Sequence, residues 1–437
     1  MSQFTGPVHR SGDDGYDDEQ AGFQRGVQNK PALVVGAADA DDVRTAVRLA
    51  ADEGRPVGVQ ATGHGTAATE DGAVLITTGR LTEVRVDPER GTARVGAGVQ
   101  AGQLIAEAAR YGLAPVNGSS PDVGVVSYTL AGGLGILGRG FGYAADGVRA
   151  VELVDAAGEV RRVTADGDAR LFWALRGAGA NFGVVTALEV DLHPLAEIYA
   201  GGMYFDADLV PEVLARFLDW TSDVPEQMAA SVAALKYPDM PMLPEPLRGR
   251  YAVHVRIVHT GDAAEGERLI APLRAIGPRL IDQVGPMPYA DCGSIYRDPP
   301  MPHAYQGASV LPSTLDTDAL LAAARAAADN SVLEVRHLGG ALSRPAEVPN
   351  AVGHRSARYL LRCVSGPIDD AVHEDIYRTA LAGQPVARRL NFLYGQASTT
   401  DKVADCFEPA DLARLRALKA EYDPANTFGI NYNIAPA

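Results

Sequence analysis

Glycine is densest in residues 115–147, PVNGSSPDVGVVSYTLAGGLGILGRGFGYAADG. Six glycines occupy the eleven positions from Gly132 to Gly142, a density at which we expect no helix to persist. Gly133 to Gly138 satisfies the GxGxxG pattern, but a dinucleotide fingerprint requires a helix that begins inside the glycine loop. The sequence therefore disfavours a Rossmann domain. It predicts an irregular loop whose bare backbone N–H groups form a concave cradle for an extended anion such as a pyrophosphate.

Short strands and helices alternate on both sides of this loop. Residues 32–38, ALVVGAA, are typical of a buried strand, and residues 39–54 carry apolar residues at helical spacing between an aspartate and a glycine. Residues 56–65, PVGVQATGHG, predict a strand that ends in a glycine turn, and residues 148–165 predict two paired strands. This alternation predicts an α+β domain over residues 31–195.

The pattern changes near His193. Residues 196–404 lack dense glycine loops and mix strand patterns with amphipathic helices, which predicts a second α+β domain with a largely antiparallel sheet. Residues 405–437 predict a helix followed by an extended, asparagine-rich end. Residues 1–30 carry a run of acidic residues among glycines, and we expect a polar N-terminal arm that is mobile or loosely packed.

Composition excludes several classes of function. The chain has 437 residues, of which 46% are hydrophobic and 22% charged, and its net charge of −16 disfavours nucleic acids and anionic membranes as partners. The sequence contains no run of about 18 apolar residues that could span a membrane, and its N-terminus has no apolar leader. We therefore expect a cytoplasmic protein. HExxH, GxSxG and clustered His, Asp or Glu ligands are absent from the sequence, so we expect neither a metal site nor serine acyl transfer. The cysteines are far apart and form no CxxC: Cys292, Cys363 and Cys406.

A second glycine cradle, ATGHG, surrounds a single imidazole, His64. A lone histidine in a glycine turn is ordinarily structural, so the order of the motifs along the chain decides its interpretation. ATGHG is followed by GSSPDVGVVSYTLAGGLGILGRGFG, LFWALRGAGANFGVVTALEV and, near the end, YDPANTFGINYNI. This order resembles the berberine-bridge-enzyme-like FAD-linked oxidases of the vanillyl-alcohol-oxidase superfamily, in their bacterial natural-product type. The resemblance covers residues 30–195 and 405–437.

The resemblance implies an α+β fold in which a PCMH-type FAD-binding domain, made of two α+β subdomains, spans residues 31–195. Residues 196–404 correspond to an inserted substrate-binding domain of antiparallel sheet plus helices. Residues 405–437 return to the FAD-binding domain.

In this family the histidine of the glycine turn is bonded to the 8α-methyl group of the flavin, which implies the same role for His64. Some members add a bond from a cysteine in a G-T-C-P segment, where this chain has Gly118, Ser119, Ser120 and Pro121. A serine hydroxyl is too poor a nucleophile to replace the thiolate. The resemblance therefore implies covalent FAD attached through His64, with no cysteinyl bond.

Further contacts with FAD follow from the same resemblance. A valine at the position of Val125 tends to accompany reaction with oxygen, which favours an oxidase. The expected contacts lie in the histidine turn, in the segment along the isoalloxazine, in the glycine loop near the phosphates and ribityl chain, in the adenine segment and in the C-terminal return: Ala61, Thr62, Gly63, His64, Gly65, Gly118, Ser119, Ser120, Val123, Gly124, Val125, Tyr128, Gly132, Gly133, Gly135, Gly183, Val184, Val185, Asn431 and Asn433.

The catalytic base is less well defined. Many relatives use a tyrosine in a Y-x-N-Y segment, and that position is Phe392 here. Tyr394 would share a strand face with it by the period of two and is the nearest substitute, with Tyr432 and Tyr128 as further candidates. The missing base also allows a substrate that ionises with little assistance, such as a phenol or hydroquinone.

The resemblance implies an FAD-dependent oxidase that acts on an alcohol, phenol or quinol of a secondary metabolite and reduces O2 to H2O2. Its partners would be a small-molecule substrate and O2. Oligosaccharide oxidation, a quinone-drug resistance role like that of the mitomycin-resistance oxidases, and a flavin-containing protein that binds a drug without turnover are the alternatives.

Overall fold

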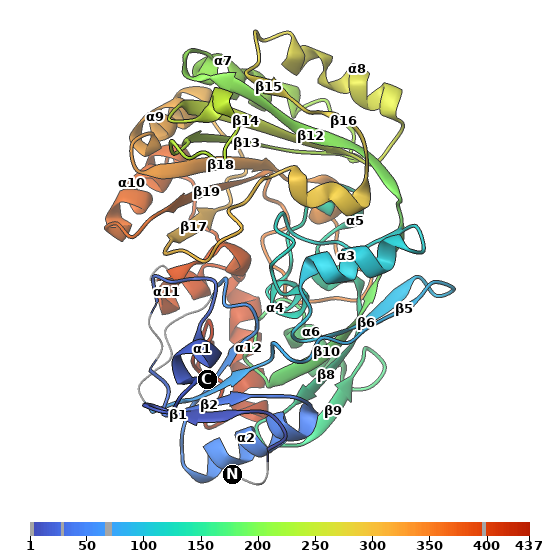
Figure 1. The fold of residues 1–437 in the computed structure, drawn as a ribbon, viewed down its shortest axis with the longest axis vertical. Coiled ribbons are helices and arrows are strands. Elements are labelled where there is room, and N and C mark those ends of the chain that lie inside the picture. Colours follow the sequence, from blue (N-terminus) through green and yellow to red (C-terminus); the bar gives the residue numbers. More distant parts are fainter. Residues whose placement is uncertain (1–3, 28–29, 66–71, 396–398) are drawn as a thin grey trace.

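The computed structural model describes residues 4–27, 30–65, 72–395 and 399–437. Two lobes lie one above the other in Figure 1, and the chain first passes from the lower to the upper lobe near residue 196. Both lobes combine helices with sheets, so the predicted α+β class is confirmed. Within the described ranges, no helix is both long enough and apolar enough to cross a bilayer.

The lower lobe begins with a four-stranded sheet. Its elements are β1 Val8–Arg10, β2 Leu33–Gly36, α2 Ala40–Asp52, β3 Val57–Gln60 and β4 Val74–Thr77. The strand order is β1-β2-β4-β3, with β2, β4 and β3 parallel, and their apolar side chains pack against α2 to form a separate core. The Asp39 carboxylate accepts the Asp42 N–H at 2.9 Å and caps α2, as the sequence predicts.

The N-terminal arm belongs to this sheet. β1 pairs antiparallel with β2, and the short helix α1 (Tyr16–Gln20) follows it. The Glu19 carboxylate accepts two hydrogen bonds of 2.7 Å from the Arg80 guanidinium, so part of the acidic run is neutralised inside the fold. The expectation of a mobile or loosely packed arm is therefore wrong for residues 4–27. Residues 1–3 and 28–29 of that prediction lie outside the described part of the chain.

A second, antiparallel sheet completes the lower lobe in the order β5-β6-β10-β8-β9. The β8–β9 hairpin confirms the paired strands predicted for residues 148–165. Helices α3 and α6 pack beside this sheet, and β7 pairs with β11. The bounds are β5 Val84–Asp87, β6 Thr92–Gly96, α3 Ala101–Ala109, β7 Leu113–Ala114, β8 Val148–Val154, β9 Val160–Val163, α6 Ala169–Leu175, β10 Val184–Asp191 and β11 His193–Pro194.

The glycine-rich loop lies between the two lobes. It contains α4 (Val125–Leu130), α5 (Gly138–Phe141) and the 3-10 turn η1 (Ala144–Gly147). The prediction that no helix persists among its glycines is wrong for α5, although that helix has only four residues. Gly142 ends it with a φ of 87°, a conformation that glycine adopts without strain.

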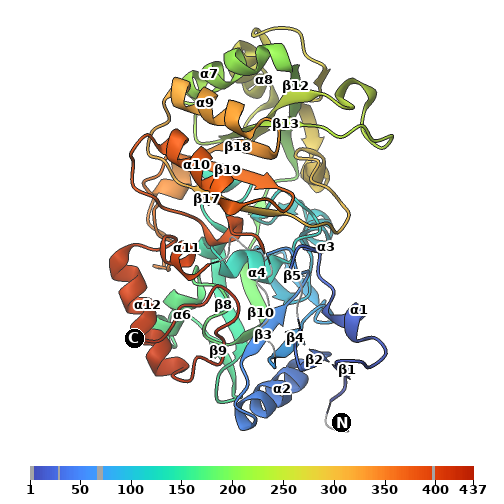
Figure 2. The same ribbon diagram turned by 90° about the vertical axis from the view of Figure 1, so that its left-hand side faces the viewer.

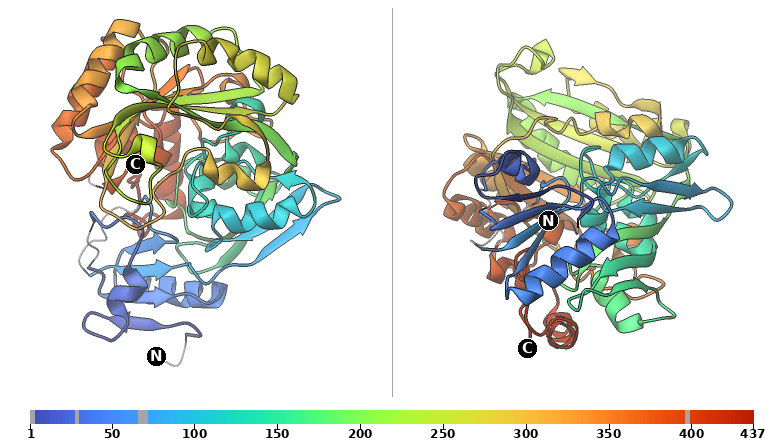
Figure 3. Two further views of the ribbon diagram at one scale, coloured as in Figure 1. Left: turned by 45° about the horizontal axis from the view of Figure 1, so that its top comes forward. Right: turned by 60° about the horizontal axis from the view of Figure 1, so that its bottom comes forward.

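The upper lobe is built on one antiparallel sheet of order β15-β12-β14-β13-β18-β19-β17, with β16 also paired to β12. Helices α7 to α10 cover its outer face, so the inner face points toward the lower lobe (Figures 1 and 3). The strands are β12 Glu197–Asp206, β13 Met228–Lys236, β14 Tyr251–His259, β15 Ile281–Asp282, β16 Gly285–Pro288, β17 Gln306–Val310, β18 Ser331–His337 and β19 Tyr359–Ser365. The helices and turns are η2 Ala207–Leu209, α7 Val210–Trp220, η3 Glu245–Leu247, α8 Ala263–Arg274, η4 Tyr289–Ser294, α9 Thr317–Ala327, η5 Gly340–Ser343, α10 Asp370–Leu381 and η6 Leu390–Phe392.

The C-terminal segment returns to the lower lobe through α11 (Thr400–Ala404) and α12 (Pro409–Tyr422), and α12 lies against α6 (Figure 2). A fully buried ion pair closes this return: Lys419 Nζ lies 2.6 Å from the Asp423 carboxylate and donates to the Asn181 carbonyl at 2.7 Å. Because both charges are removed from water, each depends on the other for its stabilisation.

Replacing the lysine tests this dependence. Lys419→Met leaves the Asp423 carboxylate buried without its cation, so we expect the free energy of unfolding to fall by about 3–5 kcal/mol. The matched control is Arg170→Met, which removes the exposed Arg170–Glu421 pair at the end of the same helix; its cost should stay within about 1 kcal/mol. Urea unfolding followed by circular dichroism measures both changes, and equal changes would contradict the buried-pair account.

Candidate functional site

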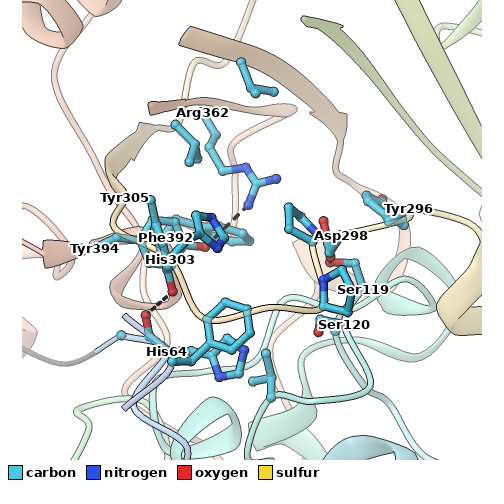
Figure 4. Close-up of a pocket in the computed structure, with 18 of the residues that line it drawn as sticks. His64, Ser119, Ser120, Tyr296, Asp298, His303, Tyr305, Arg362, Phe392 and Tyr394 are labelled. Atoms are coloured by element: carbon cyan, nitrogen blue, oxygen red, sulfur yellow. Dashed lines mark hydrogen bonds between the residues drawn. The ribbon is translucent and has the colours of Figure 1, made fainter. Parts of the chain in front are cut away.

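A cavity of about 1450 Å³ lies between the two lobes. Ligand pockets in proteins usually measure roughly 300–1,000 Å³, so this cavity has room for a large cofactor as well as a substrate. Its floor comes from the histidine turn and the glycine-rich region of the lower lobe, and its roof from the inner face of the upper sheet. Figure 4 shows His64 on one side of this space and Arg362 on the other.

The backbone of the ATGHG turn is held from outside the turn. The Phe23 and Gln24 N–H groups donate to the Thr62 and Gly63 carbonyls at 2.9 and 3.0 Å. The Tyr305 hydroxyl donates to the His64 carbonyl, as Figure 4 shows. Among the described residues, no acceptor bonds to the N–H groups of residues 62–64. The carbonyls are therefore occupied and the N–H groups remain as donors, an arrangement suited to an anionic group.

The His64 imidazole is half-buried and neutral. Burial lowers the pKa of His64 to about 4, and its ring stacks on Phe23 at a centroid distance of 3.9 Å. Its Nδ1 atom lies 2.8 Å from the Thr62 hydroxyl, whereas Nε2 is buried with no hydrogen-bond partner among the described residues. A neutral imidazole with an unpaired nitrogen inside a cofactor-sized cavity fits covalent attachment to the methyl group of a flavin.

The structure brings most of the predicted site residues to the cavity surface. Three of them, Tyr128, Tyr394 and Tyr432, are the candidate catalytic tyrosines. The predicted residues that line the cavity are Ala61, Thr62, Gly63, His64, Gly65, Gly118, Ser119, Ser120, Val123, Tyr128, Val185, Tyr394, Asn431 and Tyr432. The predicted residues that do not line it are Gly124, Val125, Gly132, Gly133, Gly135, Gly183, Val184 and Asn433.

Packing explains why part of the glycine loop lies away from the cavity. A Cβ at Gly133 would meet the Tyr128 ring at 2.9 Å, and one at Gly135 would meet the Tyr128 hydroxyl at 3.0 Å. These glycines therefore admit the Tyr128 ring, and the structure does not support their interpretation as phosphate contacts. Val125 is buried in the main hydrophobic core, so its expected position beside the flavin is not supported either.

The three candidate tyrosines have different surroundings. The Tyr432 hydroxyl oxygen lies 2.7 and 2.6 Å from the carbonyl oxygens of Gly65 and Leu393, so its single proton can be donated to either, and this contact ties the C-terminal return to the histidine turn. The Tyr128 hydroxyl is fully buried, and that burial raises its pKa. Tyr394 is also raised in pKa by burial, but its hydroxyl faces the cavity and accepts from Arg362 Nη1 at 3.4 Å.

The period-two argument that placed Tyr394 on one strand face with Phe392 is wrong. Residues 390–392 form the 3-10 turn η6, and only Tyr394 makes a bridge, to Gly307 of β17. Both side chains nevertheless line the cavity, with ring centroids 6.4 Å apart.

Several cavity residues were not identified from the sequence. Phe23 comes from the N-terminal arm, while Tyr296, Asp298 and Tyr305 come from a proline-containing segment before β17. Arg362 was not identified because the sequence predicts its strand but does not show which strands pair with it, and therefore does not show which face of the sheet Arg362 lies on. The charge of an arginine within a predicted buried strand was the available signal, since such a charge needs a partner or a ligand.

Comparison with known proteins identifies the family. Residues 31–164 match the FAD binding domain family. Over 433 residues the chain is 32% identical to (R)-6-hydroxynicotine oxidase from Paenarthrobacter nicotinovorans, with 93% of this chain and 92% of the relative covered. The chain belongs to the vanillyl-alcohol-oxidase family of FAD-linked oxidases. It is also 26% identical over 426 residues to an FAD-linked oxidoreductase from Dictyostelium discoideum, with 94% and 90% covered.

Solved structures agree with this assignment. The fold matches 6-hydroxy-D-nicotine oxidase from Arthrobacter nicotinovorans with a TM-score of 0.85 at 25% identity, covering 99% of this chain and 98% of the other. Glucooligosaccharide oxidase from Acremonium strictum matches with a TM-score of 0.84 at 19% identity, covering 99% and 97%, which shows the fold alone. The predicted PCMH-type FAD-binding fold is confirmed, and the protein is an FAD-dependent oxidoreductase.

A substitution at Gly63 tests whether FAD binding depends on the close approach of the N-terminal arm to the histidine turn. Gly63 has a φ of 71°, and a Cβ there would lie 2.5 Å from Gly22 Cα, so Gly63→Ala should displace the arm and lower the FAD content of the purified protein. Gly112→Ala is the control, because Gly112 also has a positive φ of 68° but no atom within 4 Å of its added Cβ. Both variants bear the backbone strain; the ratio of flavin to protein absorbance should fall only in Gly63→Ala. Equal FAD content in the two would contradict this role.

Proposed function

We propose that this FAD-dependent oxidase carries its FAD covalently through His64. In this proposal it oxidises an alcohol, phenol or quinol of a secondary metabolite and releases H2O2. The single observation that carries the attachment is the neutral His64 ring, whose Nε2 atom is buried and unpaired among the described residues. Ser120, at the position of the second attachment in bicovalent relatives, lines the same cavity. A hydroxyl there provides no thiolate, so a single histidyl bond is proposed.

The chain's own residues divide the cavity into two parts. Bound FAD would accept electrons from the substrate, and O2 would remove them from it. The N–H groups of residues 62–64 would hold the anionic part of the cofactor, because these residues line the cavity and their N–H groups have no acceptor among the described residues. The substrate then occupies the part of the cavity below the upper sheet, where Tyr394 and Arg362 project (Figure 4).

Tyr394 is the tyrosine best placed to act on the substrate. Its hydroxyl oxygen accepts from Arg362, and its raised pKa keeps it protonated near neutral pH. It therefore has a proton to donate to a substrate oxygen, which suits it to stabilise negative charge there better than to act as a base. The proton of the Tyr432 hydroxyl is already taken by a backbone carbonyl, of Gly65 or Leu393, so Tyr432 is proposed to position the turn.

The attachment predicts that the flavin remains with the denatured protein. A denaturing gel of the wild type should show a flavin-fluorescent band, and His64→Ala should lose that band because no other linking residue is present. Acid precipitation gives the quantitative measurement: the yellow colour should stay in the wild-type pellet and enter the supernatant for the variant. Free FAD in the wild-type supernatant would refute the covalent bond. Peroxide release during substrate screening separates an oxidase from a flavin-containing binding protein.

Loss of the Tyr394 hydroxyl should slow the reductive half-reaction. Tyr394→Phe removes one hydrogen-bond donor from the developing charge, so we expect flavin reduction to slow by about 10²-fold or more. FAD content should not change, since the ring that packs is retained. Anaerobic stopped-flow absorbance measures the rate, and Tyr422→Phe is the control because its hydroxyl contacts Asp168, outside the cavity. A rate within a few-fold of the wild type would make Tyr394 structural.

A further inference from the structure

The inner face of the upper sheet carries an arginine cluster, defined as Arg256, Arg336 and Arg362 around Glu334. Arg256 projects from β14, Glu334 and Arg336 from β18, and Arg362 from β19. The Glu334 carboxylate lies 3.0 Å from Arg256 Nη1, 3.1 Å from Arg336 Nε and 2.6 Å from Arg362 Nε. All three arginines line the cavity, whereas Glu334 lies behind them and is fully buried.

The arginine cluster has an uncompensated positive charge. Burial would raise the pKa of Glu334, but the neighbouring arginines lower it to about 2, so its carboxylate stays ionised. Three guanidinium groups around one carboxylate leave a net charge of +2. Of the other charged residues on the cavity wall, Asp298 acts on Arg362, because its negative charge raises the pKa of that arginine, but its carboxylate accepts a hydrogen bond from Ser119 and forms no ion pair with the cluster among the described residues. The remaining charged residues of the wall are Lys236, Asp239, Arg297 and Asp329.

Several donors of the cluster have no acceptor. Arg336 uses Nε for Glu334, and its two Nη atoms make no hydrogen bond within the described residues. Arg362 Nη1 reaches only the Tyr394 hydroxyl, at 3.4 Å, and is drawn pointing into the cavity in Figure 4. Both side chains are mostly buried, with 7% and 14% of their side-chain surfaces exposed. A buried guanidinium with unused donors is costly unless an anion completes it.

Aromatic rings surround the same donors. The guanidinium carbons of Arg336 and Arg362 lie 5.1 and 5.5 Å from the Phe392 ring centroid. The Arg256 and Arg336 guanidinium groups also lie over Tyr296, at 4.6 and 4.9 Å. These rings keep the guanidinium groups in place and provide apolar walls for a flat organic molecule.

We propose that the substrate binds as an organic anion, with a carboxylate or phenolate oxygen on the guanidinium groups of Arg336 and Arg362 and its carbon skeleton between Phe392 and Tyr296. This inference rests on the proposed function for the position of the substrate side of the cavity. The two guanidinium groups supply charge-assisted hydrogen bonds, and the Tyr394 proton supplies a third donor. A phenol held as its phenolate needs no base, so in the phenolate case the proposal accounts for Phe392 at the position of the family's tyrosine.

The same charge disfavours a cationic substrate. A protonated amine such as that of a nicotine would approach a net charge of +2 with reduced solvent screening. The likeness to (R)-6-hydroxynicotine oxidase therefore does not extend to an amine substrate in this proposal.

Binding of three ring compounds of equal size tests the charge preference. The FAD-loaded protein is titrated by calorimetry with benzoate, benzamide and benzylamine, which are anionic, neutral and cationic. Benzoate should bind at least 10-fold more tightly than benzamide, and benzylamine should bind least. Equal or tighter binding of benzamide or benzylamine would overturn the proposal.

Substitutions then locate the site. Arg362→Met and Arg336→Met should each weaken benzoate binding by about 10–100-fold, the usual effect of losing a hydrogen bond to a charged group. Arg170→Met, at an exposed position of the lower lobe, is the matched control and should leave the affinity unchanged. Arg362→Lys retains the charge without the paired donors and should give an intermediate value. Unchanged benzoate affinity in folded Arg362→Met and Arg336→Met would also overturn the proposal.

A coloured phenol distinguishes the two possible sources of the oxyanion. 4-Nitrophenol changes its absorbance when it ionises, so its titration on the protein reports whether the cluster lowers the pKa of a bound phenol. Ionisation at a lower pH than in water, lost in Arg362→Met, assigns a phenolate. Tight benzoate binding without that shift assigns a carboxylate. The absence of both results, with no shift for 4-nitrophenol and no tight binding of benzoate, would overturn the oxyanion site.

These measurements separate the inference from the proposed function. Calorimetry measures ligand binding without turnover and therefore tests the oxyanion site by itself. The proposed function is tested separately, by FAD attachment and peroxide release. A protein without bound FAD that still binds benzoate through Arg362 would refute the proposed function alone. An active, FAD-loaded oxidase that prefers benzylamine would refute the oxyanion site alone.

Discussion

The rest of the site depends on the way the chain holds one five-residue turn, residues 61–65. Backbone donors from the N-terminal arm bind the carbonyls of Thr62 and Gly63, and tyrosine hydroxyls from the upper lobe and the C-terminal return bind those of His64 and Gly65. With the carbonyls occupied, the turn can present only N–H groups and one imidazole to the cavity. Segments that are distant in sequence thus leave the turn, within the described residues, with free hydrogen-bond donors and no free carbonyl acceptors from Thr62 to Gly65. A binding site for the anionic pyrophosphate of FAD requires such donors.

The same contacts join the two lobes. Tyr305 reaches the turn from the segment before β17, and its ring also makes an edge contact with Tyr394 at 5.5 Å. The cofactor side and the substrate side of the cavity are therefore connected through one tyrosine. Asn391 makes a second connection, because its side chain accepts the Gly133 N–H at 2.8 Å and donates to the Tyr128 carbonyl at 2.9 Å. A change in the upper sheet would reach the flavin site through these two residues.

The sequence predicts the features that depend on near neighbours. The cap at Asp39 and the β8–β9 hairpin follow from residues a few positions apart, and the order of the motifs is sufficient to identify the FAD-binding fold. Glycines are ambiguous, because a missing Cβ admits either a ligand or a side chain; Gly133 and Gly135 admit the Tyr128 ring. Phe23 could not be found, because a stacking partner distant in sequence leaves no local pattern.

The arginine cluster illustrates the same limit on the substrate side. Its members lie on three strands, and two registers bring them together: Glu334 lies opposite Arg362 across β18 and β19, and Ser231 of β13 lies opposite both Arg256 and Arg336. These registers depend on pairing over the whole sheet, so the sequence shows isolated charged residues where the structure shows a site. A charged residue within an apolar strand was the available indication, and it does not show which other charges lie beside it.

The arginine cluster in the cavity is positively charged, whereas the chain as a whole has a net charge of −16. The two charges act on a ligand over different distances. Exposed charges are screened over about 8 Å at physiological ionic strength, so the acidic surface acts weakly on a ligand inside the cavity. Buried guanidinium groups are screened much less and interact strongly at short range. An anionic substrate therefore gains nothing from long-range attraction to this protein. Its selection must take place after entry, at donors that only a correctly placed oxyanion can complete, and specificity then follows from the geometry of Arg336, Arg362 and Tyr394.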